Sequence, residues 1–233
     1  MFPEEHPDVD WVRALADTSS PRAAGAVREA AAERSLFRHL SAEHRKERRP
    51  FYVEIEAPLE LYALARLLRP RHIVEVGVSS GVSSAYFLQA LEKNGHGTLH
   101  SVELPKLEAA GRRRSGRRFG SWSIPRGRFS GWAVPLGLRK RWDLRIGDKK
   151  KVLPLLAEEL DEVDLFLYDV PHSDPAAFRE FSTLGRRLRP GSVALVDHGG
   201  TEEICPSLRR WARSRKAVPS LRRGLGLAAF RQG

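Results

Sequence analysis

Residues 72–84, with the sequence HIVEVGVSSGVSS, decide the fold of this chain. The run His72–Val76 is short, apolar and rich in β-branched side chains, as expected of a buried strand. Glycines follow at positions 77 and 81, where a backbone without Cβ atoms can turn tightly and approach a ligand closely. The stretch therefore predicts a strand that ends in a ligand-binding turn.

A helix is expected directly after this turn, from Ser83 to Glu92. Ser83 or Ser84 can cap its first turn with a hydroxyl group. Asn94-Gly95 then supplies the left-handed residue with which many helices end. A strand, a glycine-containing turn and a helix in this order indicate the first βα unit of an α/β fold.

Outward from this unit, apolar runs alternate with helical patterns along the rest of the chain. Such alternation implies right-handed crossovers and a mostly parallel, doubly wound sheet, with ligands at the carboxyl ends of the strands. The expected strands are 98–102, 144–146, 163–168, 192–196 and 225–230, and the expected helices between them are 152–160, 175–188 and 202–216.

Two parts of the chain fall outside this alternation. Residues 21–47 are rich in Ala, Glu and Arg and predict one or two helices, so we divide the chain into an N-terminal helical extension, 1–50, and a domain, 51–233. Within the domain, an Arg/Trp-rich insertion at 106–141 is too long for an ordinary loop. We expect the tryptophans in and directly after the insertion to pack against the body of the domain rather than to contact a ligand; they are Trp122, Trp132 and Trp142.

Composition narrows the class of protein. The 233 residues carry a net charge of +11, with one cysteine, Cys205, so that no internal disulfide can form. No apolar run reaches the about 18 residues of a membrane span, and the acidic start is unlike a signal peptide, which together favour a cytoplasmic location.

The positive charge is unevenly distributed along the chain. Residues 106–151 hold 15 Lys/Arg against 3 Asp/Glu, and residues 206–233 hold 8 Lys/Arg and no acid. These segments could face an anionic partner or form a solvated surface.

The sequence disfavours two common kinds of nucleotide-binding site. A dinucleotide fingerprint would need glycines at 77, 79 and 82, but Ser79 and Val82 occupy two of these positions. The chain also has no Gly-Lys-Ser/Thr sequence of the kind that binds nucleoside triphosphates.

The pattern Glu75-x-Gly77-x-x-x-Gly81 instead resembles motif I of class I S-adenosylmethionine-dependent methyltransferases, over about residues 51–230. The resemblance implies a Rossmann-like α/β sheet with an antiparallel last strand. It also implies S-adenosylmethionine as the cofactor, with Glu103 at the end of the second strand on the ribose hydroxyls. The cofactor-binding residues expected from it are Glu75, Gly77, Ser79, Gly81, Ser83, Glu103, Gly147, Asp148 and Asp169.

The ends of the fourth and fifth strands are similar to those of small-molecule O-methyltransferases, namely the metal-dependent catechol type and a bacterial group with Asp-x-x-His after strand four. The similarity implies that Asp169, Asp197 and His198 hold a divalent ion, Mg²⁺ or Mn²⁺, and that His172 is the base. His198 stands where the family has Asn, and imidazole suits Mn²⁺ better than Mg²⁺. His198 is therefore an alternative base, and Asp169 could instead contact the cofactor or cap the next helix.

Three functions remain open at this point. We favour methyl transfer to a small-molecule hydroxyl, with the Arg/Trp-rich insertion as a cover for an anionic, phenolic or sugar-like acceptor. An RNA methyltransferase that uses the two basic segments is the second reading. A cofactor-binding protein without methyl transfer is the third. The sequence also leaves open whether the chain forms a homodimer.

Overall fold

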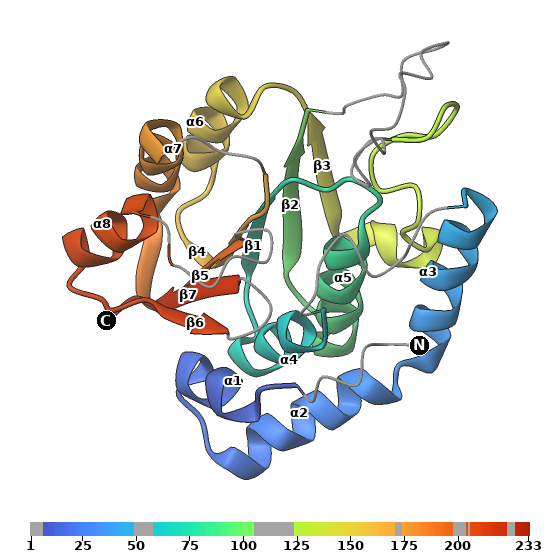
Figure 1. The fold of residues 1–233 in the computed structure, drawn as a ribbon, viewed down its shortest axis with the longest axis horizontal. Coiled ribbons are helices and arrows are strands. Elements are labelled where there is room, and N and C mark those ends of the chain that lie inside the picture. Colours follow the sequence, from blue (N-terminus) through green and yellow to red (C-terminus); the bar gives the residue numbers. More distant parts are fainter. Residues whose placement is uncertain are drawn as a thin grey trace, which may run out of the picture.

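The computed structural model describes residues 7–48, 58–104, 124–170, 174–197, 204, 206–222 and 227–233. Within them a central sheet of seven strands has helices on both faces (Figure 1). The strands are β1 His72–Val76, β2 Thr98–Glu103, β3 Trp142–Ile146, β4 Val163–Tyr168, β5 Leu188–Asp197, β6 Ser220–Arg222 and β7 Leu227–Arg231. The helices are α1 Val9–Ala16, α2 Ser20–Ala32, α3 Arg34–Lys46, α4 Pro58–Leu68, α5 Val82–Asn94, α6 Lys149–Glu159, α7 Asp174–Gly185 and α8 Pro206–Ser214, with a 3₁₀ helix, η2, at Leu136–Arg141.

The sheet is doubly wound, as the sequence predicts. Its strand order is β3-β2-β1-β4-β5-β7-β6; strands β1 to β5 pair in parallel, and β7 runs antiparallel to both β5 and β6. The chain winds outward from β1 to β3 and then crosses to β4 on the other side of β1. The topological switch point, where such sheets bind ligands, thus lies at the carboxyl ends of β1 and β4.

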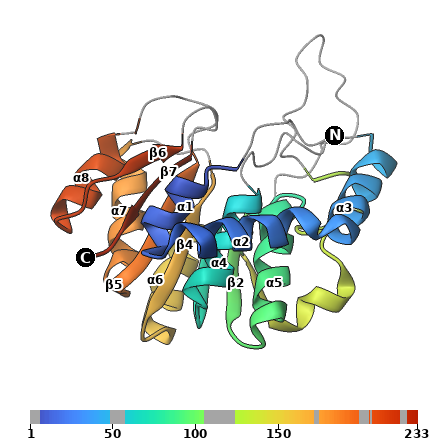
Figure 2. The same ribbon diagram turned by 90° about the horizontal axis from the view of Figure 1, so that it is seen from below.

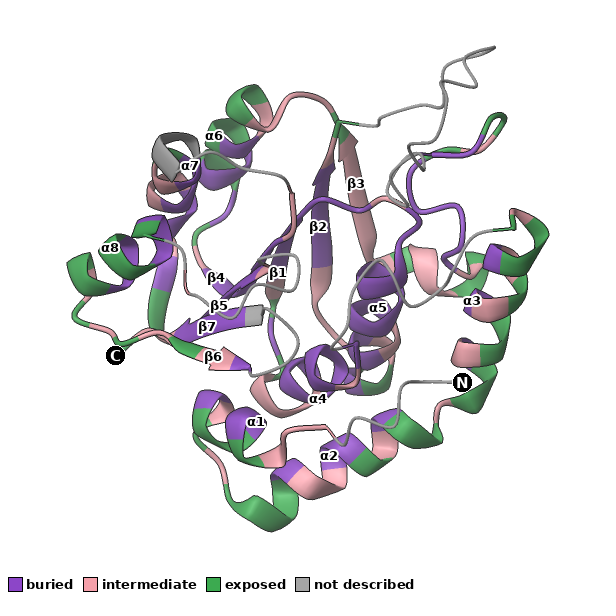
Figure 3. Ribbon diagram, viewed as in Figure 1, coloured by how far each residue is buried: buried purple, intermediate pink, exposed green. Residues whose placement is uncertain are grey.

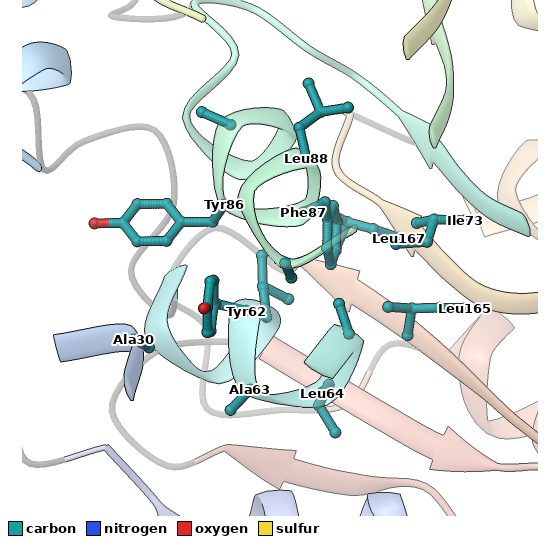
Figure 4. Packing of buried hydrophobic residues seen from close by; sticks show 14 of the residues in the cluster. Ala30, Tyr62, Ala63, Leu64, Ile73, Tyr86, Phe87, Leu88, Leu165 and Leu167 are labelled. Atoms are coloured by element: carbon teal, nitrogen blue, oxygen red, sulfur yellow. The ribbon is translucent and has the colours of Figure 1, made fainter. Parts of the chain in front are cut away.

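Alternating side chains along the strands build one hydrophobic core on each face of the sheet. On β4, Leu165 and Leu167 pack on the side of α4 and α5, whereas Phe166 and Tyr168 pack on the side of α6, α7 and α8. Figure 4 shows Leu165 and Leu167 turned toward α4 and α5, close to Phe87. Because helices cover both faces of the sheet, both sides of the central strands are buried, which explains their continuous apolar sequences.

The N-terminal extension shares the core of the α4–α5 face. Helix α2 lies across α4 (Figure 2), and α1 reaches β7. The indole Nε1 of Trp11 donates to Ser220 Oγ at 3.1 Å, and Arg231 donates to the carbonyl of Leu15 at 3.0 Å. Residues on both sides of position 50 therefore share one hydrophobic core, and the division into an extension, 1–50, and a domain, 51–233, stays a prediction.

The structure corrects several expected boundaries. Helix α7 ends at Gly185 rather than 188, because Leu188 already pairs with Val163 in β5. Helix α8 begins at Pro206, a residue that suits the first turn of a helix. The sequence also missed α1 and β6, both of which are short. In the described part of the chain, no helix is long and apolar enough to cross a membrane.

Candidate functional site

The glycine-rich turn after β1 lies directly on the end of β4. Gly77 has φ = +96°, and a Cβ atom at this position would be 1.9 Å from the carbonyl oxygen of Asp169. The Asp169 N–H donates to the carbonyl of Val76 at 2.8 Å, while the Gly77 N–H donates to that of Val102 at 3.0 Å. Only glycine fits this crossing of three strand ends, so the turn can bring its backbone close to a ligand.

Glu103, the predicted ribose-binding residue, is held against this turn. Its Oε2 accepts hydrogen bonds from the backbone N–H groups of Val78, at 2.6 Å, and Ser79, at 2.8 Å. Ser79 has φ = +49°, a left-handed conformation that is uncommon for residues other than glycine. A carboxylate can accept about four hydrogen bonds, so two backbone donors leave acceptors for the hydroxyls of a diol.

Glu75 is fully buried and does not face solvent at the turn. Its carboxylate accepts hydrogen bonds from the hydroxyls of Ser83 at 2.5 Å, Ser84 at 2.6 Å and Ser101 at 2.7 Å, and Trp142 Nε1 donates to Ser101 Oγ at 2.8 Å. Burial raises the pKa of the Glu75 carboxyl, although the three hydroxyl donors act in the opposite direction. Glu75 thus ties β1, β2, β3 and α5 together beneath the turn.

This arrangement corrects the expected cap of α5. Gly81, at φ = +91°, is the N-cap residue and has no side chain with which to cap the helix. The hydroxyls of Ser83 and Ser84 donate to Glu75 instead of capping the helix. Sequence reasoning did not assign Ser84 or Ser101 to the site. The register that places Ser101 opposite Glu75 could not be known before the strands were paired. The expected contact of Ser83 with a cofactor stays a prediction.

Gly147 and Asp148 form the neighbouring turn, after β3. The Gly147 N–H donates to the carbonyl of Glu103 at 2.8 Å, so this turn lies beside the end of β2. Asp148 caps helix α6 and accepts a hydrogen bond from the N–H of Lys150 at 2.9 Å. The position agrees with an adenine-side turn, but helix capping already accounts for the carboxylate of Asp148, so its cofactor role stays a prediction.

The predicted catalytic end is described only in part. Asp169 follows β4 and Asp197 ends β5, and the register Tyr168 with Val196 makes these two positions neighbours at one edge of the sheet. Carboxylate oxygens are suitable ligands for Mg²⁺ or Mn²⁺. The described residues include no group of three side chains that could hold a metal. His172 and His198 lie outside the described residues, so the metal site and both candidate bases stay predictions.

The end of the Arg/Trp-rich insertion packs on the glycine-rich turn, which sequence reasoning did not foresee. The N–H groups of Gly131 and Ala133 donate to the carbonyls of Ser79 at 2.8 Å and Ser80 at 3.0 Å. A Cβ atom at Gly81 would lie 2.9 Å from the Cα of Gly131. Two of the three tryptophans pack as expected, Trp132 in the core and Trp142 against it, whereas Trp122 lies outside the described residues.

Comparison with known proteins agrees with this geometry. Residues 74–198 match the family model described as a methyltransferase domain, and no curated protein matches the chain by sequence. Among solved structures, the O-methyltransferase TomG of Streptomyces achromogenes, in complex with S-adenosylmethionine, is similar with 21% identity and a TM-score of 0.53 over 85% of this chain and 89% of that one. An O-methyltransferase from Bacillus cereus in complex with S-adenosylhomocysteine has 15% identity and a TM-score of 0.53 over 84% and 90%. The calicheamicin methyltransferase CalS11 has 16% identity and a TM-score of 0.54 over 99% of both chains.

Proposed function

This chain belongs to the methyltransferase-domain family, and from that premise we propose that it transfers the methyl group of S-adenosylmethionine to a hydroxyl oxygen of a small molecule. The observation that carries the proposal is the contact between the Glu103 carboxylate and the N–H groups of Val78 and Ser79. It fixes an acceptor-rich side chain beside a turn that only glycine can form. TomG and the Bacillus cereus enzyme, which share the fold, were solved with S-adenosylmethionine and S-adenosylhomocysteine respectively.

The residues at the turn fit this cofactor. Glu103 would accept from the ribose hydroxyls, and the turn from Gly77 to Gly81 would lie along the methionine part. Gly147 would let the chain pass close to the adenine. When bound, the cofactor supplies a methyl group on a sulfonium, a good leaving group for in-line displacement by an acceptor oxygen. Because such a displacement depends on geometry, alignment by the surrounding residues can provide most of the catalysis.

The acceptor hydroxyl must also lose its proton. Asp169 and Asp197, together with His198, would hold a Mg²⁺ or Mn²⁺ ion that lowers the pKa of this hydroxyl. Without a metal, His172 or His198 would accept the proton directly, since the pKa of histidine lies near neutrality. Asp169 could then contact the cofactor instead.

Methyl transfer from radiolabelled S-adenosylmethionine to a panel of acceptors tests this proposal. The panel should begin with catechols, vicinal diols and sugars, each assayed with EDTA, Mg²⁺ or Mn²⁺. We expect label in at least one hydroxyl acceptor, and an Asp197→Asn variant should lose that activity if the metal is required. Cofactor binding without transfer to any acceptor class would favour a binding protein and contradict the proposal.

One observation supports RNA as a second class of acceptor. Helix α8 has both buried and exposed parts (Figure 3). Leu208 and Trp211 are buried, whereas Arg209, Arg210 and Arg213 are exposed. None of these three arginines forms an ion pair with a described carboxylate, so the helix presents cations to solvent that phosphates could neutralise.

Salt dependence separates the two classes of acceptor. RNA binding should weaken steeply as salt is raised, whereas turnover of a small molecule should change little. An Arg209→Ala/Arg213→Ala variant should weaken RNA binding only if RNA is the acceptor. A cytoplasmic location and a homodimer remain predictions, to be tested by cell fractionation and light scattering.

A further inference from the structure

We propose that His44, on helix α3 of the N-terminal extension, is a positioning residue for the cofactor-binding turn. The inference rests on the proposed function, because it concerns how tightly the same turn holds S-adenosylmethionine. His44 has no exposed surface, although it lies more than thirty residues before the turn in the sequence. Nothing in the local sequence around His44 indicates this role.

The hydrogen bonds of the imidazole fix its tautomer. Nδ1 lies 2.8 Å from the carbonyl oxygen of Leu40, one turn earlier on α3, and Nε2 lies 3.0 Å from Ser80 Oγ. A carbonyl oxygen can only accept, so Nδ1 must carry a proton. In the neutral ring, Nε2 therefore accepts a hydrogen bond from the Ser80 hydroxyl, and α3 holds the middle of the turn through one side chain.

The same helix also holds the segment that covers the turn. The His44 ring lies 4.8 Å from the ring of Trp132, centroid to centroid, and the guanidinium of Arg128 lies 5.5 Å from the Trp132 ring. Arg128 Nε donates to Glu47 Oε1, just beyond the end of α3, at 2.7 Å. Trp132 stands between Gly131 and Ala133, whose N–H groups bind the turn.

Ser79 and Ser80 are consequently held from three directions. The N–H of Ser79 binds Glu103, the carbonyls of both serines bind the segment 131–133, and the hydroxyl of Ser80 binds His44. The left-handed conformation of Ser79 costs about 1 kcal/mol or more and persists only where surrounding contacts impose it. Removing the His44 contact lets the turn populate other conformations, and ligand binding must then order it again.

Titration with S-adenosylhomocysteine, a stable analogue of the cofactor, tests this role. We expect His44→Ala and Ser80→Ala each to raise the Kd for S-adenosylhomocysteine by about tenfold. This is the effect of losing one well-formed buried hydrogen bond. The double variant should bind no more weakly than His44→Ala alone, because Ser80→Ala removes only a hydrogen bond that His44→Ala has already removed. His44→Gln, whose amide can still reach Ser80, should recover part of the affinity. His39→Ala is the matched control, since His39 is exposed on the same helix.

A kinetic measurement distinguishes positioning from a general loss of structure. With an identified acceptor, His44→Ala should raise the KM for S-adenosylmethionine and leave kcat nearly unchanged, because saturating cofactor restores the ordered turn. A purely structural role would reduce the folded fraction, measured by urea unfolding, and leave the Kd of the folded protein unchanged.

The outcomes separate this inference from the proposed function. If the unmodified protein binds neither S-adenosylmethionine nor S-adenosylhomocysteine, the proposed function fails. If it binds them, and His44→Ala and Ser80→Ala are folded and bind equally well, the function stands and the positioning role is overturned. Should His44→Ala fail to fold, Ser80→Ala decides alone, because it keeps the buried imidazole and removes only its partner. An unchanged Kd for Ser80→Ala then contradicts the inference.

Discussion

The parallel strands of the central sheet have their amino ends along one edge, the amino edge, and their carboxyl ends along the other, the carboxyl edge. Carboxylates at these two edges bind different kinds of partner. At the amino edge, carboxylates pair with arginines: Asp143 binds Arg145 at 2.8 Å, and Asp164 pairs with Arg189. Asp143 also lies 3.0 Å from His100 Nδ1. At the carboxyl edge, Glu75 and Glu103 accept instead from serine hydroxyls and backbone N–H groups.

Positive φ angles occur at both edges, for example at Gly77 in the turn after β1 and at Gly95 near the amino edge. The two edges differ in the partners of their carboxylates, since neither Glu75 nor Glu103 forms an ion pair with a described residue. Hydrogen-bond acceptors without a cationic partner therefore lie where the cofactor is expected. Paired charges lie at the opposite end, where they contribute stability.

The largest effect is expected from Gly77→Ala. Its Cβ atom would collide with the backbone carbonyl of Asp169, so the turn cannot keep its shape, and we expect cofactor binding to weaken by at least about a hundredfold. Gly95→Ala is the matched control: Gly95 also has a positive φ, +78°, but nothing lies within 4 Å of its Cβ position. The control should lose about 1–2 kcal/mol of stability and bind normally. Equal cofactor affinities of the two variants, measured by calorimetry, would show that the turn after β1 is no more important for binding than the loop that contains Gly95.

The next effect concerns stability. Glu75→Ala leaves three serine hydroxyls without their acceptor in the core, and we expect a loss of about 3 kcal/mol in the free energy of unfolding in urea. Asp143→Ala, at the partly exposed amino edge, should cost about 1 kcal/mol. A smaller loss for Glu75→Ala than for Asp143→Ala would show that the hydroxyl cluster does not anchor the turn.

The charge of Glu75 gives this comparison a pH dependence. Burial raises its folded pKa above the ordinary value of 4.5, so its protonated form stabilises the fold below that pH. This contribution is lost as the pH rises from 4.5 toward the folded pKa. The side chain of Glu75→Gln cannot lose a proton. The unfolding free energy of this variant should therefore increase relative to that of the unmodified protein as the pH rises. A constant difference would contradict the raised pKa.

The smallest effect belongs to the amino edge. His72 Nδ1 lies 3.1 Å from His100 Nε2, and burial, with the neighbouring charge of His100, lowers the pKa of His72. Arg71 acts in the same direction, and Asp164 and Glu162 oppose it. A lowered folded pKa gives stability that is present above about pH 6.5 and is lost as the pH falls below it.

A His72→Gln variant tests that sign. We expect the unmodified protein to lose unfolding free energy below about pH 6.5, and His72→Gln to lose less. Cofactor affinity should be the same in both proteins above that pH, since His72 lies at the far end of the sheet. An altered affinity would mean that the two edges are coupled.

The sequence alone predicted the parts of the fold that depend on neighbouring residues. The strands β1 and β4 have the predicted bounds, and Gly95 ends α5 as expected. Apolar runs and a glycine in the left-handed region are local signals. The glycine-rich turn also follows β1 as predicted, and Glu103 is the last residue of β2. The ribose contact expected of Glu103 stays a prediction.

Contacts between distant segments could not be predicted in this way. The meeting of Glu75 with Ser101 depends on strand register, and the contact of His44 with Ser80 depends on where α3 lies relative to the turn. Nor did the sequence indicate that Gly131 binds Ser79 across about fifty residues. His172 and His198 lie outside the described residues, so their catalytic roles rest on the sequence.

Calorimetric titration with S-adenosylmethionine, of the unmodified protein and of two carboxylate variants, tests the central claim most directly. We predict micromolar binding, a loss of about tenfold or more for Glu103→Ala at the carboxyl edge, and unchanged affinity for Asp143→Ala on the neighbouring strand β3. No binding by the unmodified protein would contradict the proposed function. Equal binding by Glu103→Ala would contradict the assignment of the cofactor to this turn.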